Sequence, residues 1–337
     1  MAKQRKKPRS GLLRRPLTVL GKRSGIPKSL KPQQARLLIR RFHVLQKYRS
    51  TVLSILGDDL IEANYKDELA RRYPTEWKNN YMNCLGMEVP RSNEVLKIEA
   101  SMTTSELVGV LGRIDAEVAS RGGLEAYQSA SIRGQDTSRG GDSSRKLVEW
   151  LKKRGLDQYE KPLHALEIGC LNPNNQISTC GIFESVTKID LNSQSPEIMQ
   201  QDFMKRPLPK LDHNNTDEKF NLISCSLVVN FVPTPHERGE MLRRITQFLK
   251  KPLGGTMSSL FLVLPLPCVT NSRYLDENLL NCIMKKLGFS IVYLHKSTKI
   301  IYCLYEWDGV QSNTLHFPKT ELRPGSNRNN FCITFNE

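Results

Sequence analysis

The apolar residues in the first part of the chain recur with the period of helices. Between residues 32 and 54, in "PQQARLLIRRFHVLQKYRSTVLS", they fall near one face of a predicted helix: Leu37, Leu38, Phe42 and Leu45. The other face of this helix is basic and carries Arg36, Arg40, Arg41 and Lys47. We therefore expect a helix whose polar side extends a positively charged surface.

Further helical patterns follow it. "DDLIEANYKDELARRY" predicts a helix closed by Pro74, and "TTSELVGVLGRIDAEVASRGGLEAYQSAS" predicts one or two more. Thr103 or Thr104 is the expected N-cap, and the Gly122-Gly123 pair is the expected stop. No strand pattern interrupts this region, so we expect a helical N-terminal domain over residues 31–158.

The apolar pattern changes after residue 158. Short, nearly continuous runs follow, as expected of strands buried on both faces: "HALEIG", "VTKIDL", "FNLISCSLVV", "SSLFLVLPL", "FSIVYLHKS" and "IIYCLYEW". Helical stretches separate several of them, one starting at Thr234-Pro235 and another ending at Gly288. This alternation predicts an α/β domain over residues 159–337, with a mostly parallel, doubly wound sheet and an antiparallel hairpin at its edge.

Charge separates the start of the chain from the rest. The net charge is +16, and residues 1–50 hold sixteen Lys and Arg with no acid before Asp58. Residues 1–30 combine basic clusters with Pro and Gly, which predicts a disordered tail. Three interpretations stay open: a solvated tail, a mitochondrial presequence, or a nuclear or nucleolar address that also contacts RNA phosphate. The third fits best, because Lys and Pro break the amphipathic pattern of a presequence.

Several classes of protein and site are disfavoured. No apolar run approaches the roughly 18–20 residues that span a bilayer, and no signal sequence opens the chain. The eight cysteines form no CxxC pair and no Cys/His cluster with zinc spacing. We expect a protein without a membrane segment or a metal site, whose cysteines are buried thiols.

Two strand ends predict the ligand. Gly169 closes the first predicted strand and Asp190 closes the second, 21 residues later, where an acid can bind both hydroxyls of a ribose. The loop "GCLNPNN" lacks the glycines that fold over a diphosphate, and residues 170–185 leave room only for a stunted helix. A nucleoside without diphosphate fits better, and S-adenosylmethionine is the common one. A structural glycine beside an unrelated aspartate is the alternative, and a nicotinamide dehydrogenase is disfavoured by the missing loop.

The next strand ends extend this site. In "QDF", Asp202 is placed to accept from the adenine amino group of the cofactor, while the backbone or ring of Phe203 lines the base. The fourth strand ends in "CSLVVNFVPTP", where Ser226 would face the methionine end of the cofactor. Asn230 and Phe231 would then form the substrate rim. A buried Phe with an incidental Asp is the alternative for Asp202 and Phe203, and a strand end with a packing Phe is the alternative for Phe231.

These motifs together are similar to one family. "LEIGC.NP", "TKIDLN", "QDF", "SLVVNFVP.P.ER" and "SIRGQDTSRGGDSSRKLVEWL" resemble the Rossmann-like class I methyltransferases that methylate N1 of an adenine in fungal large-subunit ribosomal RNA. The resemblance covers nearly the whole chain. It implies that S-adenosylmethionine is bound by Gly169, Asp190, Asp202, Phe203 and Ser226. Metazoan relatives with a similar core serve as S-adenosylmethionine sensors.

The polar, glycine-rich segment 130–145 precedes the predicted sheet. It is either a plain linker or a lid over the cofactor. As a lid, it would offer Gln135, Ser138 and Arg139 as donors to the methionine carboxylate, replacing the dipole of the missing helix.

The sequence is consistent with two functions. The first is a ribosomal RNA methyltransferase of the nucleus and nucleolus, acting on RNA or a pre-ribosomal particle, with Asn230 orienting the target adenine and Phe231 stacking on it. The second is a non-catalytic S-adenosylmethionine-binding regulator that acts through a protein partner. The basic tail favours the first.

Overall fold

The fold is described from a computed structural model of the chain. The description covers residues 32–57, 60, 64–89, 95–124, 126–127, 141–158, 162–193, 195–209, 218–310 and 314–336. The expected basic tail lies outside these residues. So do residues 130–140 of the expected lid, which include Gln135, Ser138 and Arg139.

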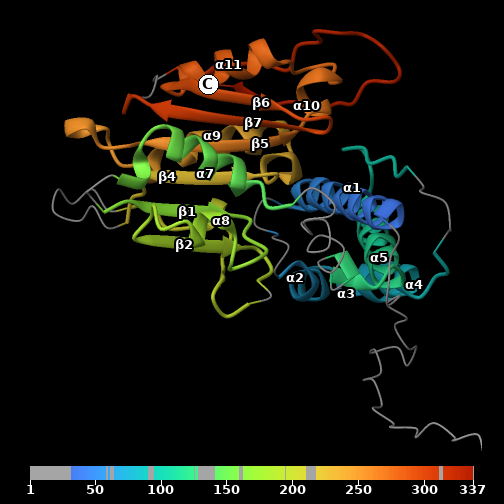
Figure 1. The fold of residues 1–337 in the computed structure, drawn as a ribbon. Helices are drawn as coiled ribbons and strands as arrows, with labels where there is room; N and C mark the ends of the chain where they lie inside the picture. Colours follow the sequence, from blue (N-terminus) through green and yellow to red (C-terminus); the bar gives the residue numbers. More distant parts are fainter. Residues whose placement is uncertain are drawn as a thin grey trace, which may run out of the picture.

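A seven-stranded sheet forms the larger half of the protein, with the strand order β3-β2-β1-β4-β5-β7-β6 (Figure 1). Its strands are β1 His164–Ile168, β2 Ser185–Asp190, β3 Met199–Gln200, β4 Leu222–Ser226, β5 Ser259–Pro265, β6 Phe289–Lys296 and β7 Ile300–Trp307. The first five strands are parallel to one another, whereas β7 pairs antiparallel with both β5 and β6. The parallel sheet and its antiparallel edge hairpin are confirmed. A second, two-stranded sheet pairs β8 His316–Phe317 with β9 Phe335–Asn336.

Helices cover both faces of the seven-stranded sheet. On one face, α7 Ser144–Lys153 and α8 Gln176–Thr179 pack with β1, β4 and β5 in one apolar cluster. On the other face, α9 Pro235–Phe248 and α11 Glu277–Lys286 pack in a larger cluster, near the short α10 Pro267–Thr270. The remaining single turns are η2 Leu156–Gln158, η3 Phe203–Lys205, η4 Val229–Phe231 and η5 Leu253–Gly255. The expected domain boundary at residue 158 would separate α7 from the sheet on which it packs.

The helical domain lies beside the sheet and has its own core (Figure 1). Its elements are α1 Pro32–Leu56, α2 Tyr65–Arg72, α3 Pro74–Glu76, η1 Trp77–Tyr81, α4 Met82–Leu85 and α5 Thr104–Ser120. Pro74 does end α2, but the chain continues at once as α3, because proline fits the first turn of a helix. Thr103 caps α5 in a capping box with Glu106, as the sequence predicts.

Two buried ion pairs fasten α1 to α5. The guanidinium of Arg41 donates to both carboxylate oxygens of Glu117, at 2.6 Å each. Arg49 donates to Asp115, which also accepts from the hydroxyls of Tyr65 and Tyr81. The expectation that Arg41 belongs to an exposed basic face is therefore wrong, since an acid on α5 neutralises it. Arg40 and Lys47 are exposed, as expected.

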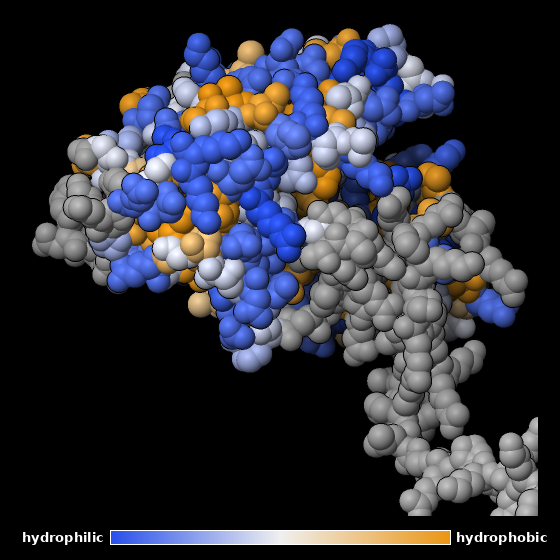
Figure 2. All heavy atoms as spheres, in the orientation of Figure 1, coloured by the Kyte–Doolittle hydropathy of each residue, from blue (hydrophilic) through white to orange (hydrophobic). Residues whose placement is uncertain are grey.

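The surface of the protein is mostly polar, because most of the apolar side chains are buried in these cores. The face drawn in Figure 2 is mostly hydrophilic over the sheet domain, with small apolar patches. Larger exposed apolar side chains include Ile291 and Leu294 on the edge strand β6. Within the described residues, no helix is both long and apolar enough to cross a membrane.

Candidate cofactor and substrate site

The ends of three adjacent parallel strands bring the predicted residues together. Ile168 on β1 is in register with Ile189 on β2 and with Cys225 on β4. The next residue along each strand therefore lies at the same level of the sheet. These residues are Gly169, Asp190 and Ser226, at the carboxyl edge where ligands bind in doubly wound sheets.

Gly169 has a backbone conformation that favours glycine, with φ of +76°. Its N–H and that of Cys170 both donate to the carbonyl oxygen of Ile189, at 2.9 and 3.0 Å. A Cβ atom at Gly169 would lie 2.5 Å from Cγ2 of Val228, in the segment after β4. Glycine is thus required both for the turn and for the approach of Val228. Its contact with a ligand stays a prediction.

Asp190 is a partly buried carboxylate at the end of β2. Its Oδ1 accepts from the N–H of Asn192 at 2.8 Å, and no cation pairs with it among the described residues. Burial raises the pKa of this carboxyl above its ordinary value, and the hydrogen bond from Asn192 opposes that shift. One carboxylate oxygen is left to accept from a ligand hydroxyl.

Asp202 follows closely in space, because the N–H of Gln201 donates to the carbonyl oxygen of Asp190 at 2.9 Å. Its Oδ1 caps the turn η3 by accepting from the N–H of Met204, also at 2.9 Å. The ring of Phe203 is buried in the core, 5.3 Å from the ring of Phe248. Of the two ways in which Phe203 was expected to line a base, its core position favours the backbone over the ring.

Ser226 is the last residue of β4, and its side chain is hydrogen-bonded to a residue from another segment of the site. Its hydroxyl lies 2.6 Å from that of Ser143, just before α7. Leu227, the next residue, has φ of +57°, which is rare for a residue with a branched side chain. This turn directs the chain out of β4 and into η4, which carries Asn230 and Phe231.

The loop after β1 contains the short helix that its length predicts. That helix, α8, has four residues, and two of its N-terminal amides already have partners. Asp142 Oδ2 accepts from the N–H of Gln176, and Ser144 Oγ accepts from that of Ile177 at 3.0 Å. The chain's own carboxylate thus occupies the place where a dinucleotide fold binds phosphate. Sequence reasoning missed Asp142 and Ser143, which lie in the polar segment that it singled out.

A buried acid, Glu167, supports this loop from β1. Its Oε1 accepts from the amide nitrogen of Asn175 at 2.7 Å, while its buried Oε2 has no partner within the described part of the chain. Burial raises its pKa to about 7. The signal for this residue in the sequence is a charged side chain inside an otherwise apolar strand.

The substrate rim joins the two domains. The amide oxygen of Asn230 is buried and has no hydrogen-bond partner among the described residues. Phe231 is 41% exposed. One side of its ring stacks on the imidazole of His43 from α1, with ring centroids 3.8 Å apart and planes 15° from parallel. His43 in turn is 3.2 Å from the hydroxyl of Tyr127, whose ring stacks on Phe42.

Comparisons with known proteins identify the family of the chain. A sequence model of the family described as "25S rRNA (adenine(2142)-N(1))-methyltransferase, Bmt2" matches residues 112–333. The 25S rRNA (adenine(2142)-N(1))-methyltransferase of Saccharomyces cerevisiae is 36% identical over 345 residues, covering 95% of this chain and 99% of the yeast protein. The chain belongs to this family. A second relative, the 25S rRNA adenine-N(1) methyltransferase of Schizosaccharomyces pombe, is 38% identical and covers 76% of this chain and 94% of its own.

The family assignment confirms the resemblance drawn from the motifs. The site residues of the sheet domain lie inside the matched segment, whereas His43 on α1 precedes it. Among solved structures, an S-adenosylmethionine-dependent methyltransferase from Clostridium acetobutylicum covers 54% of this chain and 98% of its own, at 13% identity and a TM-score of 0.39. Among the described residues, no group of His, Cys, Asp and Glu is placed to hold a metal ion.

Proposed function

We propose that this protein is an S-adenosylmethionine-dependent methyltransferase that methylates N1 of an adenine in large-subunit ribosomal RNA. Membership of the Bmt2 family supports the substrate class. The observation that carries the proposal is the rim after β4, where Asn230, whose amide oxygen has no partner among the described residues, directly precedes Phe231, which is 41% exposed. These are the two groups that an adenine needs for orientation and stacking.

The strand ends fit the cofactor. Asp190 has a carboxylate oxygen left for the ribose hydroxyls, and Asp202 lies within reach of the same edge for the adenine amino group. The turn at Gly169 and the hydroxyl of Ser226 border the remainder of the cofactor. We assign Gln135 and Arg139 to its carboxylate on the sequence alone. When bound, the cofactor supplies a methyl group on a positively charged sulfur.

The substrate base is held by Asn230 and Phe231. The buried Oδ1 of Asn230 is an acceptor, and an adenine offers a donor to it in its exocyclic amino group. Guanine presents an acceptor oxygen at the same position, so the pair would be repulsive. Leaving Oδ1 unpaired when no base is bound costs on the order of 1–3 kcal/mol, which binding of the correct base recovers.

Chemistry at N1 makes few demands on the protein. N1 carries a lone pair in the plane of the ring and can attack the methyl group without prior removal of a proton. The segment "NFVP" contains no general base, in agreement with this route. The task of the residues is in-line positioning and tolerance of a cationic product, which the face of Phe231 favours.

We place the protein in the nucleus and nucleolus, acting on ribosomal RNA or a pre-ribosomal particle. The support is the excess of positive charge in residues 1–50, which suits a polyanionic partner. Transfer of a tritiated methyl group to deproteinised large-subunit ribosomal RNA tests the function. Transfer supports an enzyme, whereas cofactor binding without transfer to RNA or to the particle would favour a regulator.

A further inference from the structure

The segment that follows Phe231 has few backbone donors of its own. In "VPTP", residues 232–235, the two prolines have no N–H. The N–H of Thr234 donates to the carboxylate of Glu237, in the capping box that opens α9. The carbonyl oxygens of this segment therefore need donors from other parts of the chain.

The side chain of Arg238 supplies these donors. From the first turn of α9, its guanidinium reaches back and donates to the carbonyl oxygens of Val232 and Pro233, at 2.9 and 3.1 Å. Among the described residues, no backbone N–H donates to either oxygen. Arg238 is also buried, so water does not take its place. One buried side chain thus fixes the two residues that follow Phe231.

The other side of this guanidinium is held by the C-terminal segment, residues 331–335. The carbonyl oxygen of Cys332 accepts from it at 2.9 Å, and the ring centroid of Phe331 lies 4.7 Å from its central carbon. The N–H of Thr334 donates to the carbonyl oxygen of Pro235 at 3.0 Å. The C-terminal segment is therefore fastened both to the guanidinium and to the start of α9.

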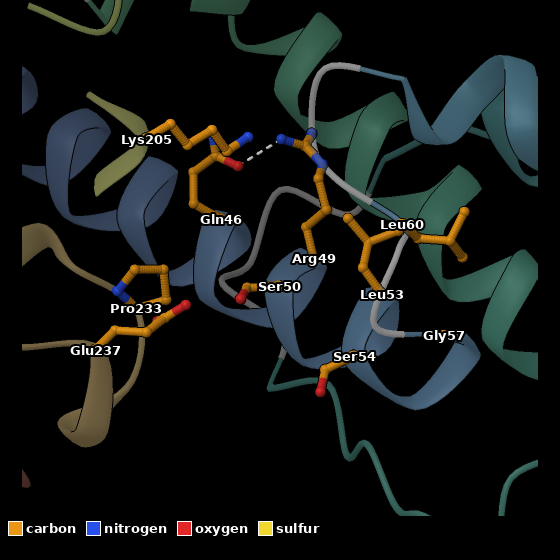
Figure 3. A pocket seen from close by; sticks show the side chains of 10 residues that line it. All are labelled: Gln46, Arg49, Ser50, Leu53, Ser54, Gly57, Leu60, Lys205, Pro233 and Glu237. Atoms are coloured by element: carbon orange, nitrogen blue, oxygen red, sulfur yellow. Dashed lines mark hydrogen bonds between the residues drawn. The ribbon is translucent and has the colours of Figure 1, made fainter. Parts of the chain in front are cut away.

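The segment after Phe231 also borders a pocket of about 370 Å³ between the two domains (Figure 3). Pro233 lines one side of this pocket, and Gln46 and Ser50 of α1 line another. His43, on the same helix, stacks on Phe231. A displacement of the segment would therefore move the stacked ring relative to α1.

We propose that Arg238 is a positioning residue for methyl transfer, which holds Asn230 and Phe231 where the target adenine meets the methyl group in line. Its guanidinium is engaged by backbone oxygens, so it acts through Val232 and Pro233 and not on the substrate. This inference rests on the proposed function and deepens it. In-line transfer depends strongly on placement, since a misplacement of about 1 Å costs on the order of a hundredfold in rate.

Arg323 provides a matched control for this role. Its partly buried guanidinium also donates to backbone carbonyl oxygens, in and after α10: those of Val269, Thr270, Ser272 and Leu275. None of these partners belongs to residues 230–235. Loss of either arginine leaves carbonyl oxygens without their donors and should lower stability, whereas only Arg238 contacts the segment that carries the rim.

The test compares Arg238→Gln and Arg238→Lys with Arg323→Gln. Methyl transfer to ribosomal RNA is measured at a temperature at which each variant is folded, and kcat is expressed per S-adenosylmethionine-binding site counted by calorimetry. We expect Arg238→Gln to lower this kcat by roughly ten- to hundredfold. Arg238→Lys keeps the charge and one donor nitrogen, so it should recover part of the loss. Arg323→Gln should keep the wild-type kcat.

The KM for RNA and the affinity for S-adenosylmethionine are further readouts. Phosphate contacts supply much of the affinity of a protein for RNA, whereas the rim is expected to contact one base. The KM for RNA should therefore change less than kcat in the Arg238 variants. The dissociation constant of S-adenosylmethionine should stay at its wild-type value, because the strand ends that are expected to bind it are not altered.

The outcomes separate the positioning role from the proposed function. No transfer by the wild-type protein to RNA or to the pre-ribosomal particle overturns the proposed function, and the positioning role falls with it. Transfer by the wild type, with a kcat per site in both Arg238 variants equal to that of Arg323→Gln, overturns the positioning role alone. Where Arg238→Gln does not fold, Arg238→Lys alone decides between these results.

Discussion

The imidazole of His43 stacks on the ring of Phe231, with centroids 3.8 Å apart. Burial lowers the pKa of His43 to about 4, so both rings are neutral at physiological pH. One residue belongs to the helical domain and the other to the rim of the sheet domain. The helical domain is therefore a structural part of the substrate site, because it fixes the ring on which the target base is expected to stack.

Removing His43 should loosen that ring. We expect His43→Ala to lower kcat for methyl transfer by roughly two- to tenfold, since an aromatic pair contributes about 0.5–1.5 kcal/mol. His43→Phe retains a ring at the position and should restore most of the activity. Calorimetry should give the same affinity for S-adenosylmethionine in both variants. Equal kcat in His43→Ala and the wild type would leave the stack as domain packing only.

Asp190 should dominate cofactor affinity. Its replacement by Ala removes a charged acceptor from the ribose site, which costs on the order of 1.5–3 kcal/mol, or roughly ten- to hundredfold in affinity. Calorimetric titration with S-adenosylmethionine measures this directly. Asp157→Ala, an exposed acid on η2, is the matched control. An unchanged dissociation constant in Asp190→Ala would remove this residue from the site.

Glu167 should make stability depend on pH. Its pKa is raised from 4.5 to about 7 in the folded protein. Between these values the unfolded chain has lost the proton and the folded chain keeps it, so the free energy of unfolding falls as pH rises through this window. The loss is at most about 3.5 kcal/mol, at about 1.4 kcal/mol per pKa unit, and it levels off above pH 7.

Glu167→Gln is neutral at every pH and should lack this component. Urea unfolding at pH 5 and pH 8 measures it, with Glu184→Gln, an exposed acid, as the control. The Gln variant should lose less stability than the wild type between the two pH values. The same loss in both proteins would show that Glu167 does not hold its proton in the fold.

Local sequence signals predicted the elements but not the contacts between them. The cap at Thr103, the stop at Gly288 and the stunted α8 follow from residues close in the chain. The length of the loop from 170 to 185 was enough to exclude a full helix there. Periodicity, in contrast, placed Arg41 on an exposed face, because its buried partner Glu117 is 76 residues away.

The candidate site likewise combines features that the sequence predicts with contacts that it does not. Gly169, Asp190 and Ser226 each stand at the end of a predicted parallel strand. Because ligands bind at the ends of parallel strands, their place in one site was predictable. Two contacts depend on how distant segments pack: the hydrogen bond from the N-terminus of α8 to Asp142, and the stack of His43 on Phe231. No periodicity or motif in a single sequence contains that information.

The identity of the methylated atom tests the central claim most directly. Ribosomal RNA is incubated with the protein and S-adenosylmethionine, digested to nucleosides and analysed by mass spectrometry against standards. The account predicts 1-methyladenosine as the product, with much lower yield from Asn230→Ala and Phe231→Ala at unchanged cofactor affinity. A methyl group on the exocyclic amine or on a ribose hydroxyl, or full yield from both variants, would contradict it.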